Sequence, residues 1–171
     1  MSLSDPNVIA ESGAALRAVL RGGDEREQRA ALSAFAYVAD PASRNMVVEI
    51  VLDGRRPAAV RSAGVRALAA LAAHGDGEAL ELLSGLLLDD EGVVVDQAVE
   101  EIAALKDARV PTLIAARLRE ARAAGRRAPA CRALGEFWRR YELDLAGTLT
   151  RRDRRSEAID AIVSSVDERR G

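Results

Sequence analysis

The sequence predicts an all-α protein, and three observations support this prediction. Apolar residues make up 49% of the chain and aromatic residues only 3%, so alanine and leucine, which are strong helix formers, supply most of the apolar volume. β-Branched residues follow the alternating pattern of a half-buried strand for only a few positions at a time. Apolar residues instead recur at helical spacing in four segments that start 32 to 34 residues apart.

These four segments start at Glu27, Val60, Val94 and Arg126. In every segment the residue four positions after the start is Ala or Gly, and the residues eight and eleven positions after it are large and apolar. These positions lie on one face of a helix, because each residue turns a helix by about 100°. Each segment therefore predicts an amphipathic helix.

A second apolar segment precedes each of these helices, so the predicted repeat unit is a pair of helices joined by a short turn. In chain order these segments read VIAESGAALRAVL, MVVEIVLDG, ALELLSGLLLDD and VPTLIAARL.

Asp5 and Asp40, each followed by proline, are predicted helix N-caps, and Asp24 and Glu27 have the spacing of a capping box. The last apolar segment, AIDAIVSSV, predicts a helix that caps the C-terminal end. We expect one domain over residues 1–171, with repeats over 5–39, 40–74, 76–106 and 107–142 and a cap over 150–169.

The small residue four positions after each start indicates how the helices pack. It allows the two helices of a pair to approach closely, and the large residues at the later positions fill the space between pairs. One pair cannot bury its apolar face alone, so stacked pairs form one continuous core. Residues five positions after each start are expected to pack laterally, or to form an apolar floor for a partner's helix: Leu32, Val65, Val99 and Cys131.

The segment AALKDARVPTLIAARL, residues 103–118, carries a Leu, an Asp-x-Arg, a Val-Pro and a Leu-Ile in series. It resembles the turn between successive HEAT-like repeats of the short class typified by phycobilisome-lyase-type bacterial proteins. The resemblance covers roughly Asp5 to Tyr141 and departs at Gly64, where the family usually has alanine. It implies a right-handed α-α superhelix, a solenoid of about four helix pairs, in which the second helix of each pair lines the concave face.

The face implied by this resemblance carries bands of charge. Positions two, six and thirteen after each start point away from the core, and from the first repeat to the fourth they read mixed, basic, acidic and basic. Residues 76–107 include ten acidic and one basic residue, whereas residues 117–155 include twelve arginines and five acidic residues. The predicted partner-binding residues are Arg29, Arg61, Arg66, Asp96, Glu100, Arg132 and Arg139.

These charges allow two interpretations. In one, the bands bind a partner of complementary charge and steer its approach. In the other, Arg66, Glu100 and Arg132 form ion pairs between repeats and satisfy one another. Three further arginines have no acidic neighbour among the band positions, which keeps the binding interpretation open: Arg29, Arg61 and Arg139.

Few residues suggest catalysis or metal binding. His74 lies close to Asp76 and Glu78, but we interpret it as a helix-end residue, because a metal site needs further ligands nearby. The carboxylates of LLDDEG are interpreted as capping and turn residues. Cys131 is expected to be a buried or half-buried core residue rather than a nucleophile, and Trp138 to pack at the end of the stack. No catalytic residue, metal site or cofactor is expected.

The favoured function is a non-enzymatic, cytoplasmic, bacterial scaffold that binds a protein partner on its concave face. The first residues show no signal-peptide pattern, and no apolar run is long enough to cross a membrane. Alternatives are a lyase-type or chaperone-like accessory subunit that holds a protein substrate for cofactor attachment, and self-association of the acidic middle with the basic end of another copy. Nucleic-acid binding is disfavoured, because the isoelectric point is near 5.6 and the acidic band would repel phosphates.

Overall fold

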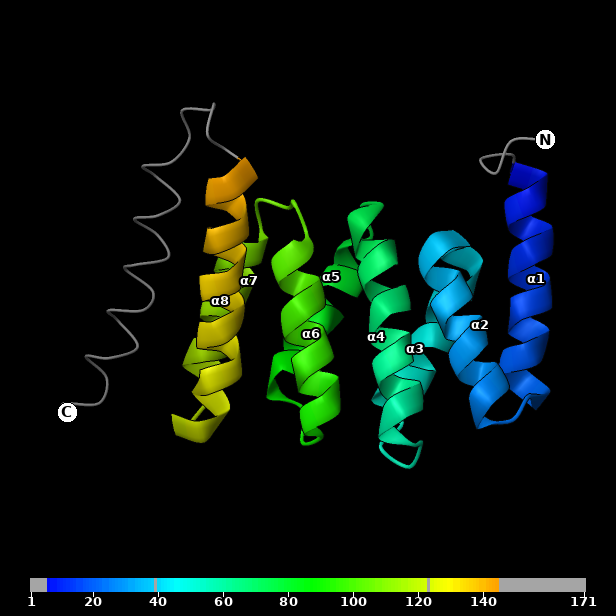
Figure 1. Ribbon diagram of the computed structural model, residues 1–171, viewed down its shortest axis with the longest axis horizontal. Coiled ribbons are helices and arrows are strands. Elements are labelled where there is room, and N and C mark those ends of the chain that lie inside the picture. Colours follow the sequence, from blue (N-terminus) through cyan, green and yellow to red (C-terminus); the bar gives the residue numbers. More distant parts are fainter. Residues whose placement is uncertain (1–5, 39, 123, 145–171) are drawn as a thin grey trace.

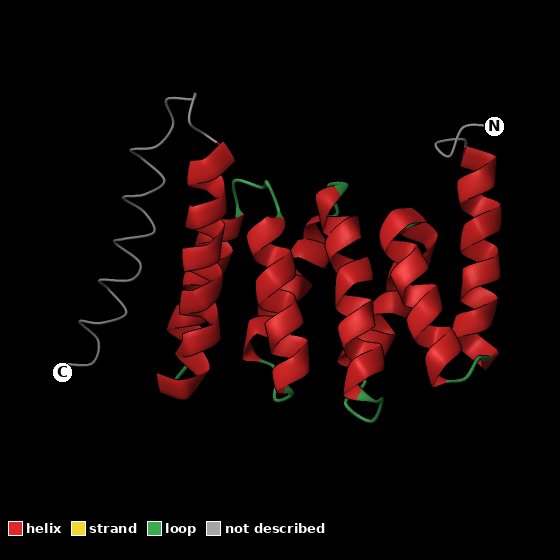
Figure 2. Ribbon diagram, in the orientation of Figure 1, coloured by secondary structure: helices red, strands yellow, loops and turns green. Residues whose placement is uncertain are grey.

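The computed structural model describes residues 6–38, 40–122 and 124–144, and within these residues all regular structure is helical (Figure 2). The prediction of an all-α protein is confirmed. The elements are α1 (Pro6–Gly22), α2 (Glu25–Val38), η1 (Pro41–Ser43), α3 (Arg44–Leu52), α4 (Ala58–Ala73), α5 (Gly77–Gly85), η2 (Leu86–Leu88), α6 (Gly92–Ala104), α7 (Val110–Glu120) and α8 (Ala124–Asp144), where η denotes a 3-10 helix. No helix in this part of the chain combines the length and the apolar content that crossing a membrane requires.

The helices pack as consecutive pairs. α1 contacts α2, α3 contacts α4, α7 contacts α8, and α6 contacts both α5 and η2. The second helices also pack against one another in chain order, so α2, α4, α6 and α8 form the row seen in Figure 1, which we call the front row. α3, α5 and α7 lie behind it, and α1 and α8 lie at opposite ends (Figure 1). Two α-helices begin in each predicted repeat range, whereas the predicted cap over 150–169 lies outside the described residues.

Residues of the repeated pattern form the centre of the core. The residue eight positions after each start is buried in all four front-row helices: Phe35, Leu68, Ile102 and Leu134. The small residue four positions after each start is buried as well: Ala31, Gly64, Ala98 and Ala130. All of these residues except Gly64, which has no side chain, belong to one cluster of buried residues. The same cluster includes residues of α3, α5 and α7. The predicted amphipathic faces are therefore confirmed.

The residues five positions after each start behave differently along the row. Leu32, Val65 and Val99 are buried, in keeping with lateral packing of one front-row helix on the next. Cys131 occupies the same position on α8 and is exposed, so the expectation that it is buried or half-buried is wrong. The physical reason is its place in the row: α8 is the last of the described front-row helices, and no further described helix covers this position.

Aspartates fix the starts of several helices. Asp24 and Glu27 form the predicted capping box, in which the Glu27 N–H donates to Asp24 Oδ1 at 2.8 Å and the Asp24 N–H donates to Glu27 Oε2 at 2.9 Å. Asp40 is the N-cap of η1, as predicted, and accepts a hydrogen bond from the Ala42 N–H at 3.1 Å. The Asp40 carboxylate also pairs with Arg17 of α1, which ties the first helix pair to the second.

Gly64 allows α4 to lie close against α3. A Cβ at this position would lie 2.5 Å from Val51 Cγ2, well inside the separation of about 3.5–4 Å at which carbon atoms attract each other. Val51 is completely buried, and its β-branched side chain has little rotamer freedom with which to move away. The structure thus gives a reason for glycine at the position where the HEAT-like resemblance leads us to expect alanine.

We expect Gly64→Ala to lower the free energy of unfolding by about 1–2 kcal/mol. Overpacking a filled core destabilises the protein by more than the higher helix propensity of alanine stabilises it. Urea unfolding followed by circular dichroism measures the change. Gly85→Ala is the matched control: Gly85 ends α5 with φ −63° and ψ −34°, and a Cβ there meets no atom within 4 Å. The control should be neutral or stabilising, and equal losses in the two variants would contradict the close approach of α3 and α4.

Candidate functional site

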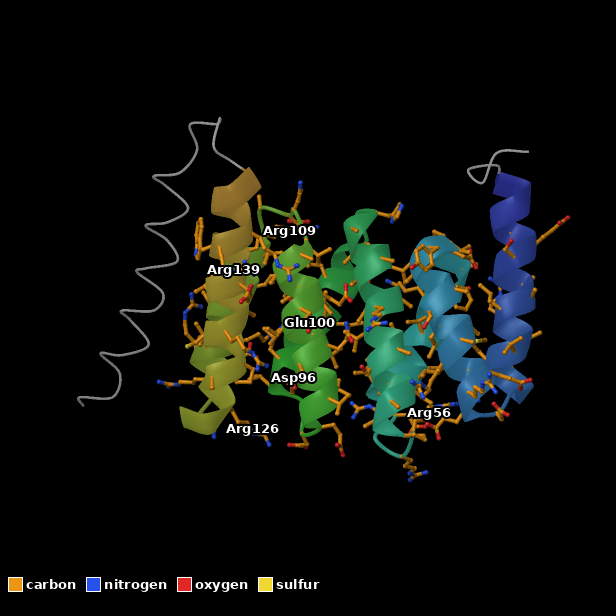
Figure 3. The ribbon with its side chains drawn as sticks, in the orientation of Figure 1. Arg56, Asp96, Glu100, Arg109, Arg126 and Arg139 are labelled. Atoms are coloured by element: carbon orange, nitrogen blue, oxygen red, sulfur yellow. The ribbon has the colours of Figure 1, made fainter. Side chains whose placement is uncertain are left out.

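The exposed side of the front row carries most of the predicted binding residues. Exposed charged side chains stand on each of its helices: Arg29 on α2, Arg66 on α4, Asp96 and Glu100 on α6, and Arg132 and Arg139 on α8. Figure 3 shows Asp96 and Glu100 one above the other on α6, with Arg139 on the neighbouring α8 at a higher level in the view. Their spacing along α6 is one turn, as expected for positions i and i+4 of a helix. The charges of successive helices therefore adjoin one another.

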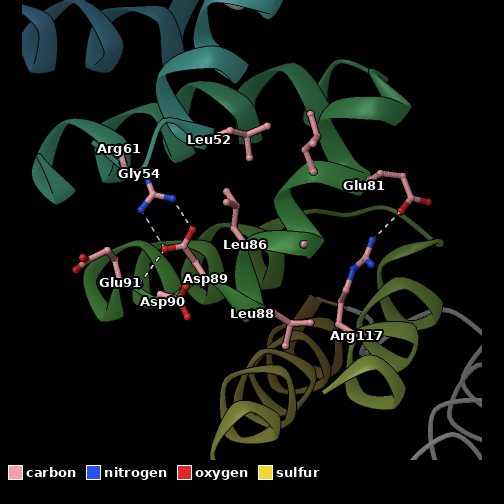
Figure 4. A pocket seen from close by; sticks show the side chains of 12 residues that line it. Leu52, Gly54, Arg61, Glu81, Leu86, Leu88, Asp89, Asp90, Glu91 and Arg117 are labelled. Carbon is pink, nitrogen blue, oxygen red and sulfur yellow. Dashed lines mark hydrogen bonds and ion pairs between the residues drawn. The ribbon is translucent and has the colours of Figure 1, made fainter. Parts of the chain in front are cut away.

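Arg61 is the exception: it is buried, so the expectation that it lies exposed among the other charged residues of this side is wrong. Arg61 is only 5% exposed, and its Nε–H group donates a hydrogen bond to the Val51 carbonyl oxygen at 2.7 Å. Its two terminal nitrogens bind the Asp89 carboxylate, Nη1 donating to Oδ1 at 3.1 Å and Nη2 pairing with Oδ2 (Figure 4). Arg61 thus joins α4 to the end of α3 and to the segment that precedes α6.

The sequence contained a signal for the burial of Arg61. It directly follows the start residue Val60, so it lies about 20° around the helix from Leu68, which belongs to the core. A basic side chain beside the core is compatible with burial when a carboxylate and a carbonyl satisfy its donors. Only the tertiary structure identifies Val51 and Asp89 as those partners.

Ion pairs between repeats form, but neither of the predicted pairs of Glu100 with Arg66 and Arg132 is among them. Arg66 lies beside Glu101, with 3.9 Å between Nε and Oε1, and Arg132 pairs with Asp96. The side chain of Glu100 makes no hydrogen bond or ion pair within the described part of the chain. Most of these side chains are about half exposed or more, so each pair contributes only about 0–1 kcal/mol to stability.

Gln97 reinforces the contact between α4 and α6, a role that the sequence did not reveal. Its side-chain oxygen accepts a hydrogen bond from Arg66 Nη2 at 3.2 Å, and its side-chain nitrogen donates to Glu101 Oε1 at 2.8 Å. The amide therefore holds one end of the Arg66 guanidinium and one oxygen of Glu101. Both charged groups are thereby kept at the contact between the two helices.

Arg139 also has an acidic neighbour that was not expected from the sequence. Its Nη2 donates to Glu136 Oε2 at 2.6 Å, one turn earlier on α8. This hydrogen bond holds the pKa of the Glu136 carboxyl below its usual range, with a smaller contribution from the charges of Arg139 and Arg140. The Glu136 carboxyl therefore stays ionised, and neutralises Arg139, to a lower pH than it would without this hydrogen bond. The overlooked signal was the i, i+3 spacing of the two residues.

A groove of about 520 Å³ lies on the front row between α2 and α4, and we call it the basic groove. It is lined by Arg26, Arg29, Ala30 and Ser33 of α2 and by Ala59, Ser62, Ala63 and Arg66 of α4. None of these described lining residues is acidic. The side chains of Arg26 and Arg29 are exposed and make no hydrogen bond or ion pair with the residues that the structure describes. Two guanidinium groups thus face a groove without a counter-charge of their own.

Arg26 was not among the predicted binding residues, although its position indicates that it belongs there. It precedes the start residue Glu27, which places it within about 20–60° of the outward-facing positions two and six after the start. The predicted bands include only positions after each repeat start, so they leave out a residue that lies just before one. Arg29 and Arg66, which were predicted, line the same groove.

A second cavity, of about 680 Å³, is lined by residues from α3 to α7 (Figure 4). Leu52, Leu86 and Leu88 supply its apolar part. Its arginines are already paired, Arg61 with Asp89 and Arg117 with Glu81, the latter at 3.2 Å. Charged groups that satisfy one another hold helices together and leave little charge for a ligand, so this cavity is the weaker candidate.

The remaining candidates for chemistry have structural roles. His74 follows the last residue of α4, and its Nδ1 lies 2.8 Å from the Ala70 carbonyl oxygen. Asp76 is the N-cap of α5 and accepts a hydrogen bond from the Ala79 N–H at 3.0 Å. The Trp138 ring meets that of Phe137 edge-on, with 5.7 Å between the ring centroids, in a half-buried position on α8.

Comparison with known proteins returned no significant match to a family model, to a curated protein or to a solved structure. The HEAT-like resemblance therefore stays a prediction.

We expect Asp89→Asn to lower the free energy of unfolding by about 3 kcal/mol, because it leaves the guanidinium of Arg61 buried without a counter-charge. The asparagine oxygen can still accept the Glu91 N–H that Asp89 Oδ1 accepts at 2.9 Å, so the turn before α6 is retained. Urea unfolding measures the loss.

Asp90→Asn is the matched control for this measurement. Asp90 pairs with Arg126, but these two side chains are 83% and 53% exposed, against 13% and 6% for Asp89 and Arg61. The control should change stability by less than about 1 kcal/mol. A loss of similar size in both variants would show that the burial of Arg61 does not determine how much stability is lost.

Proposed function

We propose that the chain is a non-enzymatic, cytoplasmic scaffold that binds a partner protein on the exposed side of the front row. In this proposal the helix pairs form a right-handed HEAT-like superhelix with the front row on its concave face. The observation that carries the proposal is that charged side chains from successive front-row helices adjoin one another and do not fully neutralise each other. Arg26, Arg29 and Glu100 have no partner within the described residues.

Charges placed in this way favour recognition of a macromolecule. The side chains belong to separate helices that are fixed by a common core, so their relative positions are set before a partner arrives. A partner with the complementary order of charges is attracted from a distance and is held in one register. The exposed pairs, such as Arg132 with Asp96, are weak enough to exchange for contacts with that partner.

The mixed sign of the surface favours a protein over a nucleic acid. Phosphate groups bound near Arg29 and Arg66 would continue toward Asp96 and Glu100 of α6, which repel them. A protein surface can present acidic and basic groups in alternation and so match both parts of the row. Self-association remains the second candidate, because the chain itself contains such an alternation, and salt-dependent oligomer size would reveal it.

We expect Glu100→Arg to reduce capture of the partner at least about tenfold and to leave the melting temperature nearly unchanged, because Glu100 is exposed and its side chain has no partner to lose in the part of the chain that the structure describes. Pull-down from the source lysate at low and high salt, with identification of the captured protein, measures binding. Light scattering of the purified chain at the same two salt concentrations separates a partner from a second copy.

Glu49→Arg supplies the matched control. Glu49 is an exposed glutamate of α3, behind the front row, and the substitution makes the same change in net charge. It should leave capture within about twofold of the unsubstituted chain. Equal weakening by both substitutions would mean that overall charge and not the front row governs binding, and a lower melting temperature with unchanged capture would favour a structural role for Glu100.

A further inference from the structure

We infer that the basic groove between α2 and α4 binds the carboxylates of a short, extended, acidic segment of the partner protein. This inference rests on the proposed function and specifies the chemistry of one part of the surface. The groove presents three guanidinium groups, Arg26, Arg29 and Arg66, and its described lining includes no acidic side chain. A guanidinium offers five N–H donors in a plane that matches the two oxygens of a carboxylate.

The repeat register arranges these arginines along the groove. Arg29 and Ser62 lie two positions after their repeat starts, and Ser33 and Arg66 lie six positions after them. These residues line the groove from its two walls, so an arginine on one helix has a serine at the equivalent position of the other. A small hydroxyl at the position equivalent to a large guanidinium leaves room for a ligand between the helices and adds a hydroxyl donor to those of the guanidinium groups.

The dimensions of the groove suit about three residues of an extended chain. The lining of α2 runs from Arg26 to Ser33, which are seven residues or about 10 Å apart along the helix axis. An extended chain rises about 3.3 Å per residue and covers this length in about three residues. Alanines supply the apolar part of the lining and leave space for a peptide backbone: Ala30, Ala59 and Ala63.

The three arginines differ in how readily they accept a ligand. Arg26 and Arg29 have no partner within the described residues, so a carboxylate binds them without displacing an existing contact. Arg66 already donates to Gln97 and lies 3.9 Å from Glu101. A ligand carboxylate therefore competes with Glu101 for Arg66, and neutralising Glu101 should strengthen binding.

The surroundings limit the directions in which the anion can extend. Across α4 the front row continues with α6, which presents Glu101 beside Arg66 and, next to it, Glu100, whose side chain has no partner among the described residues. The positive potential is thus confined to the region of α2 and α4. An anion that extended across α4 would meet these carboxylates, whereas a short acidic stretch that lies along the groove stays clear of them.

The experiment is an NMR titration of the full-length chain with a peptide that carries three consecutive glutamates between neutral residues. We expect saturable binding in the millimolar range at low salt, weakened by added salt, with the largest amide shift changes in α2 and α4. The same peptide with glutamine in place of glutamate should bind at least about tenfold more weakly. No saturation, or equal affinity of the two peptides, would overturn the inference.

Two substitutions test the arginines in the same titration. Arg29→Glu should abolish measurable binding, and Arg29→Ser should weaken it about fivefold or more, so the conclusion does not depend on one variant. Arg119→Glu is the matched control, because Arg119 is an exposed arginine of α7 behind the front row. It should leave affinity within about twofold. Unchanged affinity in both Arg29 variants would exclude the groove as the site.

Glu101→Gln tests the competition for Arg66. The glutamine oxygen still accepts from Gln97, so the contact between α4 and α6 is preserved while the charge is removed. We expect peptide affinity to rise about two- to fivefold. Glu49→Gln removes one negative charge from α3 and should raise peptide affinity by less than half the increase that Glu101→Gln causes. An equal rise in both variants would show that Glu101 does not compete with the peptide for Arg66.

Parallel titrations with a phosphoserine peptide and a short single-stranded oligonucleotide identify the preferred anion. Binding of either one at these residues without binding of the glutamate peptide would overturn the inference. This outcome is separable from failure of the proposed function. If the glutamate peptide does not bind but Glu100→Arg still reduces partner capture, the front row binds a partner through other contacts and only the acidic segment is excluded.

Discussion

The packing of each front-row helix against the next is the contact on which the rest of the structure depends. Leu32, Val65 and Val99 are buried at equivalent positions of α2, α4 and α6, and small residues such as Ala69 and Ala103 are buried four positions further along. Small side chains in these positions let neighbouring helices lie close, and a helix pair alone would leave them in water. This packing also decides which residues face outward, because a helix that is fixed on one face has its opposite face fixed as well.

Buried polar contacts add direction to this apolar packing. Arg61 links α4 to the last turn of α3 and to Asp89 before α6, and Asp40 links η1 to Arg17 of α1. Hydrogen bonds of charged groups need a defined geometry, whereas apolar contact tolerates many arrangements. These links therefore help to set how one helix pair lies relative to the next, and with it the width of the groove between α2 and α4 on the exposed side.

The sequence predicted the helices and their buried faces because both depend on spacing within one segment of chain. Position eight after each repeat start is apolar and buried in all four repeats, from Phe35 to Leu134. The pairing of side chains from different segments was not predictable in the same way. Glu100 and Glu101 are adjacent in sequence, yet only Glu101 lies beside Arg66, because the offset of α4 against α6 and the hydrogen bonds of Gln97 decide the pairing. The exposure of Cys131 is likewise a tertiary property, because it depends on whether another helix packs against that face of α8.

The same distinction between buried and exposed contacts explains how one surface can be both ordered and available for binding. If Arg61 lost its contact with Asp89, a buried charge would be left without a counter-charge, which costs several kcal/mol. This pair therefore behaves as part of the core. The side chains of Arg66 and Arg132 are 54% and 52% exposed, and water already screens their pairs with Glu101 and Asp96. A carboxylate from outside can replace such a partner at little cost, because the guanidinium keeps a counter-charge throughout. Ion pairs between the repeats are therefore compatible with the proposed recognition of a partner, because the exposed pairs keep Arg66 at the basic groove and Arg132 on the front row without consuming their capacity to bind another carboxylate.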